Sequence, residues 1–329
     1  MTRLIMAAAA AMVLGGPAAA QEFKPAVIFD MGGKFDKSFN EAAYNGAEMF
    51  KKEAGTDYLE FEVTNESQRE QSLRKLAQRG ATVIVATGFA QAPALKTVAA
   101  EFPDVKFTLI DDVVDLPNVQ SIIFKEHEGS FLVGVLAATA SKTGKVGFVG
   151  GMDIPLIRKF ACGYVQGAKY ANPNAQVFEN MTGTTGDAWN DPTKGGELAR
   201  SQFDRGADVV YAAAGGTGLG VYQAAKDSGK LAIGVDSNQN YIHPGTMLTS
   251  MLKRVDLAVY NAFKTAQAGS WKPGVQILGL AEDGVGWALD DYNKALITPD
   301  MQAKVEQAKK DIIAGTIQVH DYTADSACP

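Results

Sequence analysis

Acidic side chains and glycines stand directly after the short apolar runs of this sequence. Asp30, Asp111 and Asp236 each follow a run of the kind that forms a buried strand, and Gly215–Gly218 follows another. A carboxylate can accept hydrogen bonds from several N–H or O–H donors, and glycines leave backbone N–H groups open. No basic cluster accompanies them. The pattern therefore favours recognition of an uncharged molecule rich in donors over recognition of a phosphate.

Catalytic and metal-binding signatures do not emerge from the residue spacings. The three histidines, His127, His243 and His320, have no spacing that lets them share a metal, and the two cysteines form no C-x-x-C pair. There is no G-x-S-x-G elbow. The glycines from 215 to 220, with Asp236 further on, resemble a dinucleotide fingerprint, but their spacing differs from G-x-G-x-x-G. We expect no metal, no cofactor and no enzymatic activity.

Two aromatic residues and one lysine stand close to these positions. Trp189 lies in a polar loop, 182–191, and Phe39 begins a predicted helix. Each could pack against the core, or could form a platform for a flat ligand, which gains about 1–3 kcal/mol per stacked base. Lys253 is predicted at the start of a later helix. There it is either a solvated surface residue or, because it opposes the helix dipole, a functional one.

An alternation of strands and helices positions these residues. In the first half we predict strands at 26–29, 58–63, 82–87 and 106–110, and helices at 39–53, 67–79 and 93–102. Ser38 is expected to cap the first helix, with Glu41 completing a capping box. In the second half we predict strands at 145–149, 175–179, 208–213 and 231–235, and helices at 130–141, 157–170, 193–205 and 219–228. This rhythm predicts an α/β fold of two lobes, each a parallel sheet flanked by helices, facing each other across a cleft.

Length and charge agree with such a protein. The chain has 329 residues, with 31 Lys+Arg and 37 Asp+Glu, and 46% of its residues are hydrophobic. This length suits two domains, each with its own core. The acidic balance argues against nucleic acid as a partner, because phosphates are neutralised by basic surfaces.

The first twenty residues have the pattern of an export signal. Arg3 precedes an apolar stretch, and small residues, Ala18 to Ala20, precede Gln21. No cysteine lies near this cleavage site, so we expect a cleaved signal peptide at 1–20 and a freely diffusing periplasmic protein. Export would place Cys162 and Cys328 in an oxidising compartment, where they are either joined in a disulfide or remain two separate thiols.

Several of these stretches, taken together, resemble the basic membrane protein family, the purine-nucleoside receptors of ABC importers. The resemblance runs in collinear order from about residue 25 to 315. It is carried by Phe35–Glu41 (FDKSFNE), Val105–Asp111 (VKFTLID), Glu128–Gly134 (EGSFLVG), Gly150-Gly151, Ile233–Gln239 (IGVDSNQ) and Thr249–Lys253 (TSMLK).

The resemblance implies a two-lobed periplasmic binding protein fold of type I and a role for each candidate residue. Phe39 and Trp189 would stack on the two faces of a purine, although family members usually carry Phe at the second position. Asp111 would bind the base edge, and Asn40 would help hold the ligand. Asp236 and Lys253 would bind the ribose hydroxyls. Gly215 would line the sugar, and Asp30 would sit in the cleft.

The resemblance also implies the function: a monomeric receptor that captures a purine nucleoside by lobe closure and docks on an ABC permease. The first lobe would comprise 21–125 plus about 251–278, and the second 126–250 plus about 279–329. Three alternatives stay open. The same scaffold could bind riboflavin or a sugar, the chain could be an exported nucleoside-processing enzyme, or it could serve as a sensory co-receptor rather than in transport.

Overall fold

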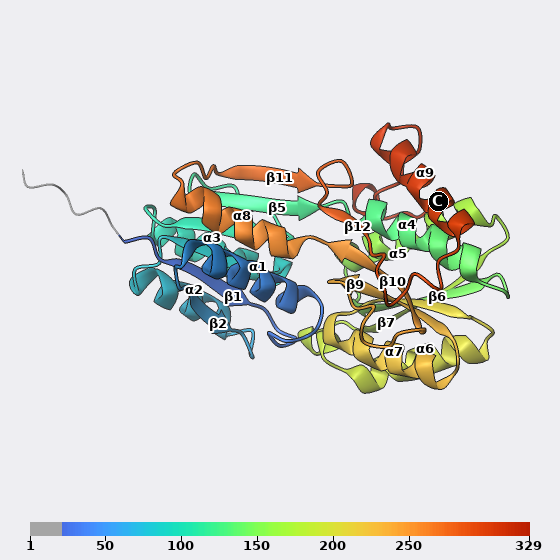
Figure 1. The fold of residues 1–329 in the computed structure, drawn as a ribbon. Coiled ribbons are helices and arrows are strands. Elements are labelled where there is room, and N and C mark those ends of the chain that lie inside the picture. Colours follow the sequence, from blue (N-terminus) through green and yellow to red (C-terminus); the bar gives the residue numbers. More distant parts are fainter. Residues whose placement is uncertain (1–21) are drawn as a thin grey trace, which may run out of the picture.

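The computed structural model describes residues 22–329, which form two six-stranded sheets. Figure 1 shows the two sheets side by side, each with helices on both faces. The signal peptide predicted at 1–20 lies outside the described residues. The chain crosses between the sheets at Lys125, at Arg254 and through 279–284. We call each sheet with its helices a lobe; the boundaries given above stay a prediction.

The first sheet has the strand order β11-β5-β4-β3-β1-β2, and all its pairs are parallel. Its strands are β1 (Pro25–Phe29), β2 (Leu59–Glu62), β3 (Val83–Ala86), β4 (Lys106–Ile110), β5 (Val119–Phe124) and β11 (Gly274–Leu278). Its helices are α1 (Phe39–Ala54), α2 (Gln68–Gln78), α3 (Ala92–Glu101) with the 3-10 turn η1 (Phe89–Gln91), and α8 (Val255–Gln267).

Alternating residues of β1 bury their side chains on opposite faces of this sheet. Val27 and Phe29 join the cluster that includes Phe50 of α1 and Phe263 of α8. Ala26 and Ile28 join the cluster under α2 and α3. Because both faces are covered, the strand is apolar throughout rather than alternating, as is typical of parallel sheets.

The second sheet repeats the plan, with the order β12-β10-β9-β8-β6-β7. Its strands are β6 (Lys145–Met152), β7 (Gln176–Gly183), β8 (Val209–Ala213), β9 (Leu231–Asp236), β10 (Met247–Lys253) and β12 (Val285–Trp287), and only the β10–β12 pair is antiparallel among those described. Its helices are α4 (Glu126–Ala140), α5 (Pro155–Ala171), α6 (Pro192–Asp204), α7 (Gly218–Asp227) and α9 (Pro299–Ile313), with the turns η2 (Gly186–Trp189), η3 (Gly215–Thr217) and η4 (Tyr322–Ala324).

The structure corrects three local expectations. Lys253 does not begin a helix; it is the last residue of β10, and α8 starts two residues later. The helix expected at 130–141 begins at Glu126, directly after the unexpected strand β5. Ser38 makes no side-chain cap for α1. Instead, the carboxylate of Asp36 accepts backbone N–H bonds from Ser38, Asn40 and Glu41, at 2.8, 3.0 and 3.1 Å.

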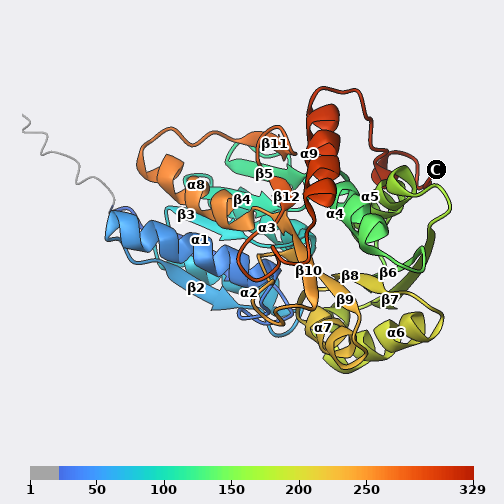
Figure 2. The ribbon, with the colours of Figure 1, turned by 45° about the vertical axis from the view of Figure 1, so that its right-hand side comes forward.

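The C-terminal segment returns to α5, as the turned view in Figure 2 shows. A disulfide joins Cys162 of α5 to Cys328, with the Cα atoms 5.5 Å apart. Gln166 fixes the same segment by donating to the carbonyl of His320 (3.0 Å) and accepting from its N–H (2.8 Å). No helix within residues 22–329 is both long and apolar enough to cross a bilayer.

Candidate functional site

A cavity lies where the carboxyl ends of strands from both sheets meet, the usual place for a ligand in parallel α/β folds. The cavity is partly open to solvent, and about 610 Å³ of it, open solvent included, is not filled by protein atoms. All eight candidate residues from the sequence line it: Asp30, Phe39, Asn40, Asp111, Trp189, Gly215, Asp236 and Lys253. The structure therefore brings the whole set together, although the residues come from separate elements.

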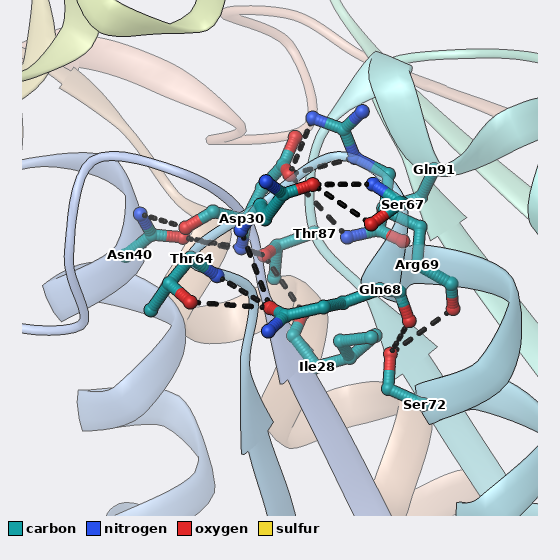
Figure 3. A network of polar contacts seen from close by, with 11 residues as sticks. Ile28, Asp30, Asn40, Thr64, Ser67, Gln68, Arg69, Ser72, Thr87 and Gln91 are labelled. Atoms are coloured by element: carbon teal, nitrogen blue, oxygen red, sulfur yellow. Dashed lines mark hydrogen bonds and ion pairs between the residues drawn. The ribbon is translucent and has the colours of Figure 1, made fainter.

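Asp30, directly after β1, is fixed by partners that the sequence analysis did not identify. Its Oδ1 lies 3.0 Å from both Nε and Nη2 of Arg69 and 3.5 Å from Nε2 of Gln91. Figure 3 shows these two side chains on one side of Asp30 and Asn40 on the other. Burial raises the pKa of Asp30, and the Arg69 guanidinium opposes that rise. Arg69 and Gln91 therefore hold the Asp30 carboxylate through Oδ1 alone.

Asn40, the second residue of α1, uses its amide on the loop after β1. Its Oδ1 accepts from the Asp30 N–H at 3.1 Å, and its Nδ2 donates to the Asp30 carbonyl at 3.1 Å and the Gly33 carbonyl at 3.3 Å. These three bonds fix the loop that carries Asp30, and Figure 3 shows Asn40 beside Asp30. In this structure the side chain orients its neighbours.

Asp36 is a lining residue that the sequence analysis missed. It caps α1 from a buried position, and burial raises its pKa to about 7 despite three backbone N–H bonds. The signal was present in the sequence, because an Asp two residues before the expected cap can accept the same orphan N–H groups.

Lys253 is buried at the end of β10 and is surrounded by acids and aromatic rings. Its Nζ lies 2.7 Å from Oδ2 of Asp111 and 3.0 Å from Oε1 of Glu126. The Phe39 ring centroid is 5.1 Å from the same nitrogen, within cation–π range. Burial lowers the pKa of Lys253, but the neighbouring carboxylates more than reverse this and raise it. A buried ammonium with such partners stays charged.

Asp111 and Asp236 both adopt left-handed backbone conformations, with φ of 77° and 64°. For residues other than glycine such conformations are costly, and they concentrate at functional sites. Burial raises the pKa of both, to about 6 for Asp111, while Lys253 acts in the opposite direction. Asp236 Oδ2 accepts from the Ser38 hydroxyl at 2.5 Å. Asp111 Oδ1 is buried and has no hydrogen-bond partner within residues 22–329.

Trp189 sits in η2 on the second lobe, and two glycines make room for it. A Cβ at Gly151 would overlap the indole ring at Cζ3, so only glycine lets the ring pack there. Gly215 has φ of 57°, and a Cβ on it would approach the Trp189 carbonyl at 3.3 Å. Gly215 therefore lines the cavity with backbone.

The remaining lining residues are mostly apolar and were not singled out from the sequence. They are Met31, Gly88, Phe89, Leu156, Ile157, Phe160, Ala213, Ala214 and Val235. In sequence they look like ordinary core residues, so no local signal marks them. Within the described part of the chain, no group of three or more His, Cys, Asp or Glu side chains could hold a metal ion. The site offers aromatic surface, carboxylate acceptors and one ammonium.

Comparisons with known proteins agree with this arrangement. The family model described as ABC transporter substrate-binding protein, PnrA-like, matches residues 23–323. The ABC transporter nucleoside-binding protein BmpA of Lactococcus lactis is 32% identical, over 91% of this chain and 89% of its own. The solved structure of an ABC transporter solute-binding protein from Aeropyrum pernix has a TM-score of 0.84 at 31% identity, covering 91% of this chain and 93% of the other. The prediction of a two-lobed α/β binding-protein fold is confirmed.

The comparisons contradict the predicted localisation. A Pyrococcus abyssi relative, 39% identical over 82% of this chain and 70% of its own, is named as a lipoprotein, and a Borreliella burgdorferi relative is named basic membrane protein D. The first name implies that this relative is attached to a membrane through a lipid, and the second names a membrane protein. The expectation of a freely diffusing periplasmic protein was wrong, because it rested only on the lack of a cysteine near residue 20.

The resemblance inferred from the sequence motifs is thus shown across most of the chain. The family consists of solute-binding proteins, which bind small molecules and deliver them to a permease. The chain belongs to the Bmp family of PnrA-like ABC transporter substrate-binding proteins.

Proposed function

We propose that this protein captures an uncharged purine nucleoside between its lobes and delivers it to an ABC permease, without chemical change to the ligand. The observation that carries the proposal is the cavity itself. It is lined by an aromatic residue from each lobe, Phe39 and Trp189, and by three aspartates at the carboxyl ends of strands, Asp30, Asp111 and Asp236. A flat base with a sugar rich in hydroxyls matches both surfaces. The name of the L. lactis relative, a nucleoside-binding protein, supports the same class.

The charges of the cavity favour a neutral ligand. Asp30, Asp36, Asp111 and Asp236 line it, against the single cation Lys253 among its described lining residues. Lys253 is already paired with Asp111 and Glu126. A phosphate group would meet repulsion that hydroxyl and N–H donors do not. We therefore expect nucleosides to bind and nucleotides to be rejected.

The contacts support one revision of the roles that the resemblance implies. Asp111, assigned above to the base edge, bonds to Lys253, which is assigned with Asp236 to the ribose. The free Oδ1 of Asp111 would then accept from a sugar hydroxyl. Asp30, held on the far side by Arg69, would serve the base edge. Phe39 and Trp189 would stack on the purine, Gly215 would line the sugar, and Asn40 would act by orienting the Asp30 loop.

Closure of the lobes would secure the ligand, because both lobes contribute to the cavity. The chain crossings at 125 and 279–284 support two of the lobe boundaries predicted from the sequence, whereas the crossing at 254 lies a few residues after the third, predicted at about 251. We also propose that the receptor acts as a monomer.

A thermal-shift screen of refolded, ligand-stripped protein tests the proposal. The panel contains inosine, guanosine, adenosine, their 5′-monophosphates, free purines, riboflavin and ribose. A ligand at 100 times its dissociation constant stabilises by about 2.7 kcal/mol, which gives a clear rise in Tm. We expect nucleosides to raise Tm and monophosphates not to.

Other outcomes of the screen would contradict the proposal in different ways. A rise with riboflavin or ribose alone would keep the binding-protein role and replace the ligand class. Conversion of inosine to hypoxanthine and ribose during incubation would show an enzyme.

A further inference from the structure

The contacts of Lys253 continue beyond the cavity into the segments that join the lobes. Lys253 immediately precedes the crossing at Arg254, and Glu126 immediately follows the crossing at Lys125. The Lys253 Nζ and the Glu126 Oε1 are 3.0 Å apart, and both side chains are buried. This ion pair therefore links two of the three connections between the lobes.

A second buried ammonium completes the arrangement. Lys159 of α5 places its Nζ 2.7 Å from Oε2 of Glu126 and 3.0 Å from the Phe124 carbonyl. Its next carboxylate is that of Asp321 in the C-terminal segment, at 4.0 Å. Glu126 thus shares its two oxygens between two lysines. Among the described residues, neither Glu126 nor Lys159 lines the cavity.

We infer that Glu126 and Lys159 are positioning residues for the ligand site, an inference that rests on the function proposed above. Glu126 holds the Lys253 ammonium on the Oδ2 side of Asp111, so that Lys253 contacts only Oδ2 and leaves Oδ1 for the ligand. Lys159 holds Glu126 in place and compensates its charge. Without Glu126, Lys253 has Asp111 and Asp236 as its remaining carboxylate neighbours and can close on both oxygens of Asp111.

The charges around these groups predict opposite effects of Glu126 and Lys159 on the pKa of Asp111. Asp111 is faced by Lys253 from β10, Glu126 from α4 and Asp236 from β9. Glu126 is faced by Lys253 and Lys159, and these two cations outweigh burial and lower its pKa. Lys159 lies near His127 as well as Asp321. Removing the negative charge of Glu126 should lower the pKa of Asp111, whereas removing the positive charge of Lys159 should raise it.

The first test uses ligand-free protein and measures the Asp111 carboxyl titration by carbon-13 NMR. We expect Glu126→Gln to move the titration to lower pH by about one pH unit. Lys159→Met should move it in the opposite direction, to higher pH. Lys159→Arg keeps the charge and should leave it in place. A purely structural role would not produce opposite shifts. If Glu126→Gln does not fold, Lys159→Met against Lys159→Arg decides the result.

The second test measures inosine affinity by calorimetry between pH 5 and 8. In the wild type, affinity should fall as the pH drops through about 6, because Asp111 accepts hydrogen bonds as a carboxylate. Lys159→Met should start this fall at higher pH. In Glu126→Gln the fall should start at lower pH. The affinity of this variant at pH 7.5 should also be about tenfold lower, because Lys253 then occupies Oδ1 of Asp111 and the ligand loses one hydrogen bond.

Unchanged affinities and unchanged Asp111 titrations in both variants would overturn the inference. Failure of the wild type to bind any nucleoside would instead overturn the proposed function. In that case the ligand-free titrations would still decide whether Glu126 and Lys159 set the charge at Asp111.

Discussion

The two sheets follow the same plan, but the aspartates at the ends of their corresponding strands have different hydrogen-bond partners. β4 and β9 occupy the same place in the strand orders of the two sheets, and Asp111 and Asp236 stand at their carboxyl ends. Both residues have positive φ and both are buried. The partner of Asp111 is the ammonium of Lys253, whereas the partner of Asp236 is the hydroxyl of Ser38.

The position of each partner along the chain explains what the difference means. Both contacts join one lobe to the other. Lys253 directly precedes a crossing, so the lobe opening proposed above would move it little relative to Asp111. Ser38 is far along the chain from any crossing, so its bond to Asp236 requires the lobes to be as close as they are here. Asp111 is therefore held by a partner next to a chain crossing, which we call the hinge-side partner, and Asp236 is held by a partner that depends on closure of the lobes.

The largest effect should come from removing the hinge-side partner. Lys253→Met leaves Asp111 and Glu126 buried without their shared cation, and breaking a buried ion pair costs about 3–5 kcal/mol of unfolding free energy. The loss should be greatest at pH 8 and smaller at pH 5, because protonation of Asp111 removes its uncompensated charge, whereas Glu126 keeps Lys159 as a partner. Urea denaturation at both pH values measures it.

Lys264→Met is the matched control for this variant. Lys264 pairs with Glu53 at 3.1 Å on the exposed side of α8, so its loss should change stability little at either pH. Equal stability of Lys253→Met and the wild type at pH 8 would show that the hinge-side pair does not support the fold.

A second comparison sets the aromatic residue of one lobe against that of the other. Trp189→Ala and Phe39→Ala should each weaken nucleoside binding by about 1–3 kcal/mol through lost stacking. Phe39→Ala should also disturb Lys253, whose ammonium lies 5.1 Å from that ring, whereas the Trp189 indole packs on Gly151. Calorimetry with inosine measures both. Wild-type affinity in both variants would contradict the stacking assignment.

The amino-acid pattern predicted the strand ends well and the contacts between distant segments poorly. Apolar runs and turn residues mark where strands end, so the pattern alone was enough to place Asp30, Asp111 and Asp236 at the carboxyl edges of the sheets. Lys253 was misplaced on a helix because its run, Met247–Lys253, lacks turn residues before the next helix. Its partner Glu126 and the partner of Asp30, Arg69, depend on packing between segments that no local pattern reports.

The smallest expected effect concerns the bond that depends on closure. Ser38→Ala removes the hydroxyl that donates to Asp236, which should cost about 1 kcal/mol of unfolding free energy at neutral pH. Burial raises the pKa of Asp236, and the Ser38 hydroxyl opposes that rise, so the variant should raise it further. When an acid has a higher pKa in the folded state than in the unfolded state, the protein loses stability as the pH rises. The difference from wild type should therefore grow with pH and nearly vanish where Asp236 is protonated in both proteins.

Ser237→Ala separates this charge effect from the mere loss of a contact between lobes. The Ser237 hydroxyl donates to the Ser38 carbonyl at 3.0 Å, so it also links the lobes, but it donates to no carboxylate. Its removal should give a loss that is constant with pH. Urea denaturation of both variants from pH 4 to 8 makes the comparison. Parallel pH profiles for the two variants would mean that Ser38 acts only as a contact, and that closure does not set the ionisation of Asp236.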